Sequence, residues 1–114
     1  MKKYSIIAVD FDGTLCKDQY PEIGEANRYL IQLLKELQAN GSRLILWTCR
    51  TNEILDQAIA WSREQGLIFD EVNRNLPEVV AKYGGDSRKI FADVYIDDKS
   101  CFPWKTNERM ENLE

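Results

Sequence analysis

Two aspartates separated by one residue follow a short apolar run near the start of the chain. Asp10 and Asp12 belong to the segment Asp-Phe-Asp-Gly-Thr-Leu, directly after the apolar residues 6–9. A short apolar run that gives way to glycine predicts a buried strand ending in a tight turn. Two carboxylates at the end of such a strand are costly to place without a charge partner, and a divalent cation such as Mg²⁺ is the usual partner of oxygen ligands. The alternative interpretation is a solvated loop with two incidental acids.

Polar residues also follow two later apolar runs. Thr48 follows the second run, and Asp97 and Asp98 follow the last one. In parallel α/β sheets, ligands bind outside the carboxyl ends of the strands. We therefore expect Asp10, Thr48 and the Asp97-Asp98 pair to lie at one rim of a sheet.

The acids at this rim suffice for phosphoryl transfer. With Mg²⁺ between Asp10 and the Asp97-Asp98 pair, a carboxylate beside the cation can attack phosphorus and form an aspartyl-phosphate. Asp12 can protonate the leaving oxygen and later activate a water molecule. None of these steps needs histidine, which the chain lacks.

Hydrogen-bond donors near the rim can hold the phosphoryl group. The Thr48 hydroxyl and the N–H groups of the turn, at Gly13 and Thr14, can bind phosphoryl oxygens, and a lysine would offset the remaining negative charge. Arg50 can grip a phosphate or carboxylate of the substrate with two parallel hydrogen bonds. The alternative for Arg50 is a surface ion pair.

Apolar runs and segments of helical spacing alternate along the chain. Strands are predicted over four apolar runs, namely residues 4–9, 44–47, 67–69 and 90–96. Helices are predicted between them, namely one with apolar residues from Ala26 to Leu37 that is closed by Asn40-Gly41, one capped by Thr51 that ends before Gly66, and one from Pro77 to Gly84-Gly85. Residues 16–23 are expected to form a loop, and the residues after Pro103 a peripheral tail.

This alternation predicts the fold class. Strands that are apolar throughout, and that alternate with helices, are typical of a parallel sheet covered on both faces. The chain of 114 residues, with no repeat and no linker, is expected to form one domain over residues 1–114. The prediction is a three-layer, Rossmann-like α/β fold with a mostly parallel central sheet.

Composition excludes several function classes. Without histidine, neither a Ser-His-Asp or Cys-His centre nor a histidine-ligated zinc or iron site can form within one chain. The net charge of −4 argues against a general nucleic-acid-binding face. Cys16, Cys49 and Cys101 form no CxxC pair, which favours reduced thiols in the cytoplasm. No run has membrane-spanning length, and no signal peptide is recognisable.

Three segments together resemble the haloacid dehalogenase-like (HAD) phosphatase superfamily. Residues 10–15 resemble its first signature motif, residues 44–48 its second, an apolar strand ending in threonine, and residues 94–98 its fourth, an apolar strand ending in acids. The third motif is a lone lysine or arginine. Order and spacing match over nearly the whole chain.

The resemblance implies a role for each acid of the rim. It makes Asp10 the nucleophile and a metal ligand, and Asp12 the general acid and base, whose backbone carbonyl also contacts the metal. By similarity to relatives with an Asp-Asp ending, Asp98 is expected to bind Mg²⁺ directly and Asp97 to support it. The opposite order of Asp97 and Asp98 stays open.

The resemblance also implies a phosphoryl-binding threonine and a lysine. Thr48 takes the first role. For the second we favour Lys89, just before the last strand, with Lys82 as the next choice and Arg88 as a further one. The spacing leaves no room for an inserted cap domain, so a capless HAD-like phosphatase is expected.

A capless site is open, which suits a phosphorylated macromolecule. It also suits a phosphorylated small molecule enclosed by a neighbouring subunit of a homo-oligomer. Two alternative functions remain. One is a HAD-like domain that binds a phosphorylated ligand or protein without turnover. The other is a receiver-like phosphoacceptor domain, although there the acidic pair belongs to the first strand and not the last.

Overall fold

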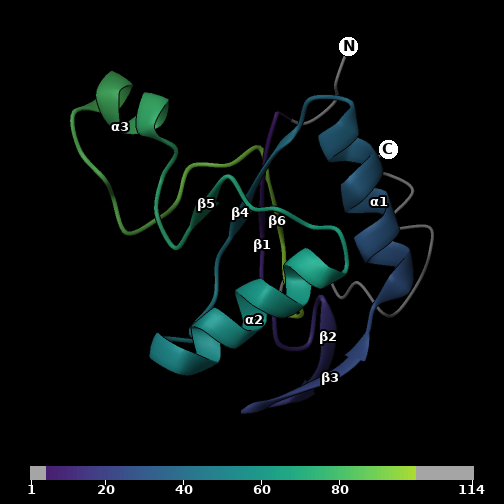
Figure 1. Cartoon of the computed structure of the whole chain (residues 1–114). Helices are drawn as coiled ribbons and strands as arrows, with labels where there is room; N and C mark the ends of the chain where they lie inside the picture. Colours follow the sequence, from purple (N-terminus) through teal and green to yellow (C-terminus); the bar gives the residue numbers. More distant parts are fainter. Residues whose placement is uncertain (1–4, 100–114) are drawn as a thin grey trace.

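A four-stranded parallel sheet forms the centre of the molecule (Figure 1). The structure is a computed structural model that describes residues 5–99. The strands lie in the order β5 (Glu71–Val72), β4 (Arg43–Leu46), β1 (Ile6–Val9) and β6 (Val94–Ile96), and each neighbouring pair is parallel. The predicted α/β fold with a mostly parallel central sheet is confirmed.

Helices cover both faces of this sheet. They are α1 (Arg28–Ala39), α2 (Asn52–Glu64) and α3 (Pro77–Tyr83). Ile7 and Leu44, which are partners in the sheet, join the core that α1 and α2 cover. Ile45, which points to the opposite face, packs with Val79 of α3. The alternation along each strand therefore produces the three layers that the sequence predicted.

Sequence signals define the ends of α1 closely. Asn27 caps the helix, since its side chain accepts the N–H of Leu30 at 3.3 Å, and Asn40 ends it. Leucines recur at helical spacing and face the core, namely Leu30, Leu33, Leu34 and Leu37. Ala26 was expected in this helix but lies in a strand, because the cap at Asn27 starts the helix after it.

Instead of the expected loop, a β-hairpin follows the first turn. It consists of β2 (Cys16–Gln19) and β3 (Glu22–Ala26), which pair antiparallel at the end of the sheet where β1 leads into them (Figure 1). The sequence does not reveal it because most of β2 is polar and exposed, so no alternation of apolar residues appears.

The third strand lies later in the chain than predicted. Residues 67–69 form no strand, although Leu67 is buried in the core and Ile68 is exposed. The chain joins β4 only at Asp70, whose N–H donates to the carbonyl of Leu44 at 2.8 Å and whose carboxylate accepts the Leu44 N–H at 2.7 Å. The hydrogen bonds between Asp70 and Leu44 therefore determine where β5 begins. The apolar content of the segment does not indicate this position.

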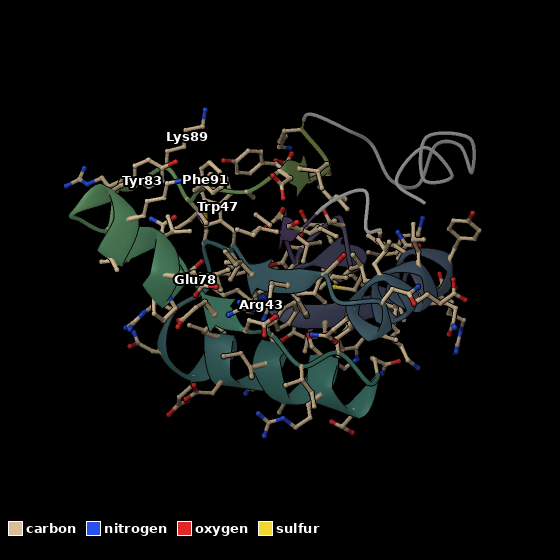
Figure 2. The ribbon with its side chains drawn as sticks, turned by 90° about the horizontal axis from the view of Figure 1, so that it is seen from above. Arg43, Trp47, Glu78, Tyr83, Lys89 and Phe91 are labelled. Carbon is tan, nitrogen blue, oxygen red and sulfur yellow. The ribbon has the colours of Figure 1, made fainter. Side chains whose placement is uncertain are left out.

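The last strand and α3 are held by their own contacts. β6 is shorter than the predicted run over residues 90–96, because Ile90 packs under α3 instead of extending the strand. Arg43 at the start of β4 pairs with Glu78 of α3, with Nη1 and Oε2 2.6 Å apart (Figure 2).

Within residues 5–99, no helix is long and apolar enough to cross a lipid bilayer. Cys101 and the tail after Pro103 lie outside the described residues.

Candidate functional site

The ends of β1, β4 and β6 meet at one rim of the sheet. Val9 is level with Leu46 on one side and Ile96 on the other. The N–H of Asp10 donates to the carbonyl of Ile96 at 2.9 Å, and the N–H of Trp47 donates to Val9 at 2.9 Å. The pairing therefore continues one residue beyond the strands and fixes Asp10 between the ends of its two neighbours.

A hollow of about 330 Å³ opens at this rim. Asp10, Thr48 and Asp97, one from each strand end, line it together. Its remaining lining residues are Ala8, Trp47, Cys49, Tyr95, Ile96 and Lys99. The structure thus brings together three of the residues that the sequence placed at the rim, and adds Lys99, which the sequence reasoning missed.

The environment of Asp10 disfavours its negative charge. Burial raises the pKa of this carboxyl to about 6, and the charges of Asp98, Asp97 and Asp12 add to the rise. A hydrogen bond from the N–H of Phe11 opposes it. A carboxyl in this position is a natural place for a cation, which would relieve the repulsion among the four acids.

Gly13 brings Asp98 close to the first turn. Its φ of +82° is one that side chains rarely adopt, and a Cβ at this position would lie 2.6 Å from Oδ2 of Asp98. Only glycine therefore allows the end of β6 to approach the turn this closely. This contact places Asp98 beside the Asp10–Asp12 segment, although Asp98 does not line the hollow.

The N–H groups of Gly13 and Thr14, which were expected to bind phosphoryl oxygens, form hydrogen bonds within the turn. The N–H of Gly13 donates to the carbonyl of Cys16 at 2.9 Å, and that of Thr14 to Phe11 at 3.1 Å. The Thr14 side chain is fully buried, and its hydroxyl has no partner among the described residues. Both residues therefore shape the turn in this structure.

Arg50 has neither of the two roles that the sequence suggested. It is fully buried, and its Nε and Nη2 donate to the two carboxylate oxygens of Asp12, each at 2.8 Å. Its other N–H groups reach backbone carbonyls of Pro21 (3.0 Å), Glu22 (3.0 Å) and Ile54 (3.3 Å). All five donors of the guanidinium are therefore engaged, and none remains for a substrate.

Aromatic rings complete the surroundings of this guanidinium. Its carbon lies 4.9 Å from the ring centre of Phe11 and 5.3 Å from that of Tyr20. The hydrogen bonds to Asp12 raise the pKa of Arg50 further above its already high value. Arg50 therefore ties the first turn, the hairpin and the start of α2 together around a permanent charge.

The loop that carries Thr48 is fixed from β5. Asn73 accepts the N–H of Thr48 at 2.8 Å, and its own N–H donates to the carbonyl of Leu46 at 2.8 Å. Asn73 has a φ of 56°, a left-handed conformation that asparagine tolerates better than most residues. The Thr48 hydroxyl accepts the N–H of Arg50 at 3.1 Å, so its hydrogen can still be donated to a ligand. The sequence around Asn73, which follows Glu71 and Val72, gave no signal of this contact.

The lysines of the region lie at different places. Lys99 lines the hollow, and its Nζ is 3.7 Å from Oδ2 of Asp98. Lys89 lies 6.0 Å from the ring centre of Tyr95, beside the hollow, and Figure 2 shows it above Phe91. Lys82 stays on α3, over the ring of Tyr83. Arg88 is exposed in the segment between α3 and β6.

The oxygen donors at the rim suit Mg²⁺, which takes few protein ligands, better than a metal whose ligands all come from the protein. Among the described residues, no three carboxylate or thiol side chains form a complete metal site by themselves. Mg²⁺ usually binds through one or two carboxylates and keeps several waters. Asp10 and Asp98 can supply the carboxylates. Asp97 is held locally, because its Oδ1 accepts the N–H of Lys99 at 2.6 Å.

One solved structure is clearly similar to this chain. It is that of a conserved protein from Bacteroides thetaiotaomicron, with 47% sequence identity and a TM-score of 0.74. The match covers 83% of this chain and 76% of the other. No family model matches the chain, and no curated protein matches it.

Proposed function

The chain belongs to the same family as this conserved Bacteroides protein, and from its own residues we propose that it is a Mg²⁺-dependent phosphohydrolase. In this proposal it acts on phosphomonoesters through an aspartyl-phosphate and is a capless, HAD-like phosphatase. The observation that carries it is the meeting of Asp10, Thr48 and Asp97 in one hollow, with Asp98 held beside the first turn by Gly13.

Asp10 is the nucleophile in this proposal. One carboxylate oxygen of Asp10 bonds to phosphorus while the bond from phosphorus to the ester oxygen breaks, and the bonding electrons leave with that oxygen. A water molecule then attacks the phosphoryl group, which frees Asp10 and releases phosphate. Bound Mg²⁺, held by Asp10, Asp98 and the backbone carbonyl of Asp12, would neutralise the carboxylates and the phosphoryl oxygens.

Proton transfer falls to Asp12. In this proposal Asp12 protonates the leaving oxygen in the first step and takes a proton from the attacking water in the second. Its ion pair with Arg50 holds the carboxylate in place for both transfers.

The remaining donors act on the phosphoryl oxygens. Thr48 and Lys99 line the hollow with Asp10, and Lys89 lies next to it across Tyr95. Positive charge aimed at these oxygens stabilises the transition state. Lys89 remains our choice for the lysine of the third motif, and Lys99 contributes from the side of Asp98.

A domain that binds a phosphorylated ligand without turnover remains the second candidate. The observation in its favour is that Arg50 already occupies both carboxylate oxygens of Asp12, the proposed acid and base. Release of phosphate from 4-nitrophenyl phosphate separates the two. We expect steady release with Mg²⁺, loss after EDTA and recovery when Mg²⁺ is restored. Full activity after exhaustive chelation would contradict the Mg²⁺-dependent enzyme.

We expect a phosphorylated small molecule or macromolecule as the partner. The cytoplasm is the compartment that we propose, because three cysteines without CxxC spacing are typical of reduced thiols.

A further inference from the structure

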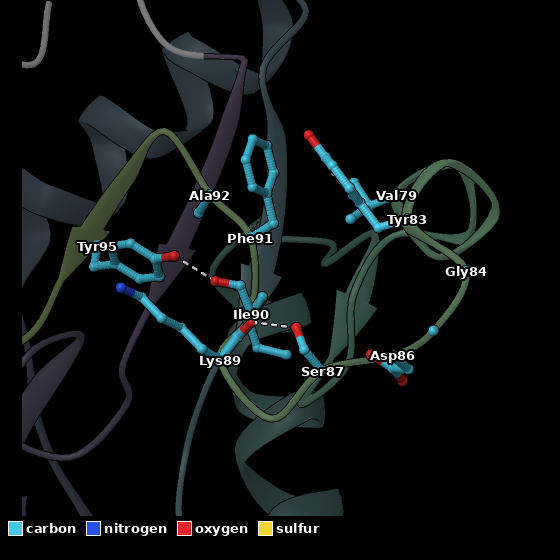
Figure 3. A pocket seen from close by; sticks show the side chains of 11 residues that line it. Val79, Tyr83, Gly84, Asp86, Ser87, Lys89, Ile90, Phe91, Ala92 and Tyr95 are labelled. Atoms are coloured by element: carbon cyan, nitrogen blue, oxygen red, sulfur yellow. Dashed lines mark hydrogen bonds between the residues drawn. The ribbon is translucent and has the colours of Figure 1, made fainter.

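A second and larger hollow lies next to the candidate active site. It measures about 890 Å³ and lies between α3, the segment that follows it and β6 (Figure 3). Most of its wall is apolar or aromatic, formed by Val79, Tyr83, Ile90, Phe91, Ala92 and Tyr95. Its volume is within the usual range of small-molecule sites, and a wall of this kind suits an apolar ring.

Two aromatic rings in this wall are left exposed. Tyr83 is 62% exposed and Phe91 is 43% exposed. Their ring centres are 6.1 Å apart with 40° between the planes. Adjoining exposed aromatic rings in a concave wall are typical of a ligand site, since they bury much area at little entropic cost.

Tyr95 connects the two hollows, because its side chain lines both. The ring is fixed from two directions. Its hydroxyl donates to the carbonyl of Ile90, and its ring centre is 5.5 Å from that of Trp47, which also lines the smaller hollow. A ligand in the larger hollow therefore lies one side chain away from the hollow that contains Asp10.

The two ends of the larger hollow carry opposite charges. Lys89 and Tyr95 stand at one end, and Asp86 stands at the other (Figure 3). Asp86 accepts the backbone and side-chain N–H groups of Asn75 at 3.1 and 2.8 Å, which lowers its pKa and keeps it charged. An anionic group is repelled at the Asp86 end and attracted at the Lys89 end, which is the end next to the active site.

We propose that the larger hollow binds the leaving group of the substrate, and that this group is aromatic. The substrate class is then an aryl phosphomonoester, with its phosphoryl group at Asp10 and its ring against Tyr83, Phe91 and Tyr95. This inference rests on the proposed phosphohydrolase function and names the substrate class of that site.

Steady-state kinetics with two esters test the proposal. The substrates are 2-naphthyl phosphate and glycerol 3-phosphate, and the variant is Phe91→Ala. Phe91 is partly exposed and its N–H donates to Asn75, so the variant keeps its backbone anchor. We expect kcat/KM to favour the naphthyl ester, and Phe91→Ala to raise KM for that ester about tenfold while kcat changes little. KM for the alkyl ester should stay the same.

Two controls complete this comparison. Tyr29→Ala removes an exposed aromatic side chain on α1, away from the hollow, and should leave both KM values unchanged. A phosphotyrosyl peptide shows whether the ring comes from a protein or from a small molecule. Preference for either aryl ester supports the proposal. Equal use of the alkyl ester, or an equal rise of both KM values in Phe91→Ala, would overturn it.

A binding measurement separates this proposal from the proposed function. In Asp10→Asn protein, 2-naphthyl phosphate should bind and shift the backbone amide signals of Ala92 and Ser87, and Phe91→Ala should weaken that binding about tenfold. If this binding is seen in a protein that hydrolyses no ester, the hydrolase function fails and the aryl site stands. If esters are hydrolysed but Phe91→Ala changes neither KM nor binding, the aryl site alone fails.

Discussion

Arg50 holds both carboxylate oxygens of Asp12 at 2.8 Å, although the two residues are 38 positions apart in the chain. The guanidinium is fully buried, so this ion pair is part of the interior. Because Asp12 is one residue from the turn glycine and two from Asp10, the pair fixes the segment that carries the proposed nucleophile. The geometry of the candidate site therefore depends on a buried residue that does not line the hollow.

Replacing Arg50 with lysine should destabilise the protein strongly. Lysine keeps the charge but cannot donate to both oxygens of Asp12 and to three carbonyls at once. We expect Arg50→Lys to lower the free energy of unfolding by about 3 kcal/mol, as for a broken buried pair, in urea denaturation. Arg43→Lys is the matched control, since Arg43 is 39% exposed in its pairs with Asp70 and Glu78. Arg43→Lys should lower the free energy of unfolding by less than about 1 kcal/mol. Equal losses would contradict a structural role for Arg50.

Gly13→Ala should weaken Mg²⁺ binding. The new Cβ would lie 2.6 Å from Oδ2 of Asp98, so the carboxylate must move away from the first turn. Gly84→Ala is the matched control, because Gly84 has a similar φ of +79° but nothing within 4 Å of its Cβ. Both variants should lose about 1 kcal/mol from the strained backbone. Only Gly13→Ala should raise the Mg²⁺ concentration needed for half-maximal binding, measured by calorimetry. An unchanged Mg²⁺ affinity would show that Asp98 is not a ligand.

The stability of the metal-free protein should fall as the pH rises from 4 to 7. Asp10 has a pKa of about 6 in the folded state and 3.8 as the ordinary value, so the folded protein binds more protons in this range. Its ionisation therefore opposes folding above pH 6, by about 1 kcal/mol once solvent screening of this partly exposed group is included. Asp10→Asn should remove that slope and stabilise the protein at pH 7.

The control for this pH dependence is Asp56→Asn on the exposed face of α2, which should keep the slope of the parent protein. Added Mg²⁺ should stabilise the parent protein more at pH 7 than at pH 5, because the metal binds the ionised carboxylate. Thermal denaturation in EDTA and in Mg²⁺ measures both effects. A Mg²⁺ effect that is equal at the two pH values would contradict a site built on Asp10.

Lys89→Ala should reduce kcat/KM by the loss of phosphoryl-group stabilisation, about 2–4 kcal/mol by analogy with the removal of one oxyanion donor. Lys82→Ala is the control, since Lys82 lies over Tyr83 on α3, away from the hollow of Asp10. Kinetics with a single aryl ester compare the two variants. If Lys82→Ala were the more damaging change, the assignment of the third motif to Lys89 would be wrong.

The sequence predicts best what depends on neighbours along the chain. The apolar runs before Asp10, Thr48 and Asp97 mark strands, and a parallel sheet then brings these residues to one rim, as observed. The glycine at the end of α3 is a local signal of the same kind.

The features that the sequence does not reveal depend on contacts between distant residues. Nothing near Arg50 in the chain indicates that its partner is Asp12 or that the hairpin folds around it. The hairpin itself is too polar to show an apolar pattern, and β5 is placed by the side chain of Asp70. For the same reason Lys99 and Asn73 were missed, since their importance comes from their neighbours in space.

The central claim is that Asp10 is phosphorylated during turnover. The most direct measurement mixes the protein with Mg²⁺ and an aryl phosphate, stops the reaction in acid, and reduces it with borohydride, which turns a phosphorylated aspartate into homoserine. Peptide mass spectrometry then locates the product. We predict homoserine at position 10 in the parent protein and none in Asp10→Asn, whose turnover should be lower by orders of magnitude. Hydrolysis without modification of Asp10, or near-normal turnover in Asp10→Asn, would contradict the account.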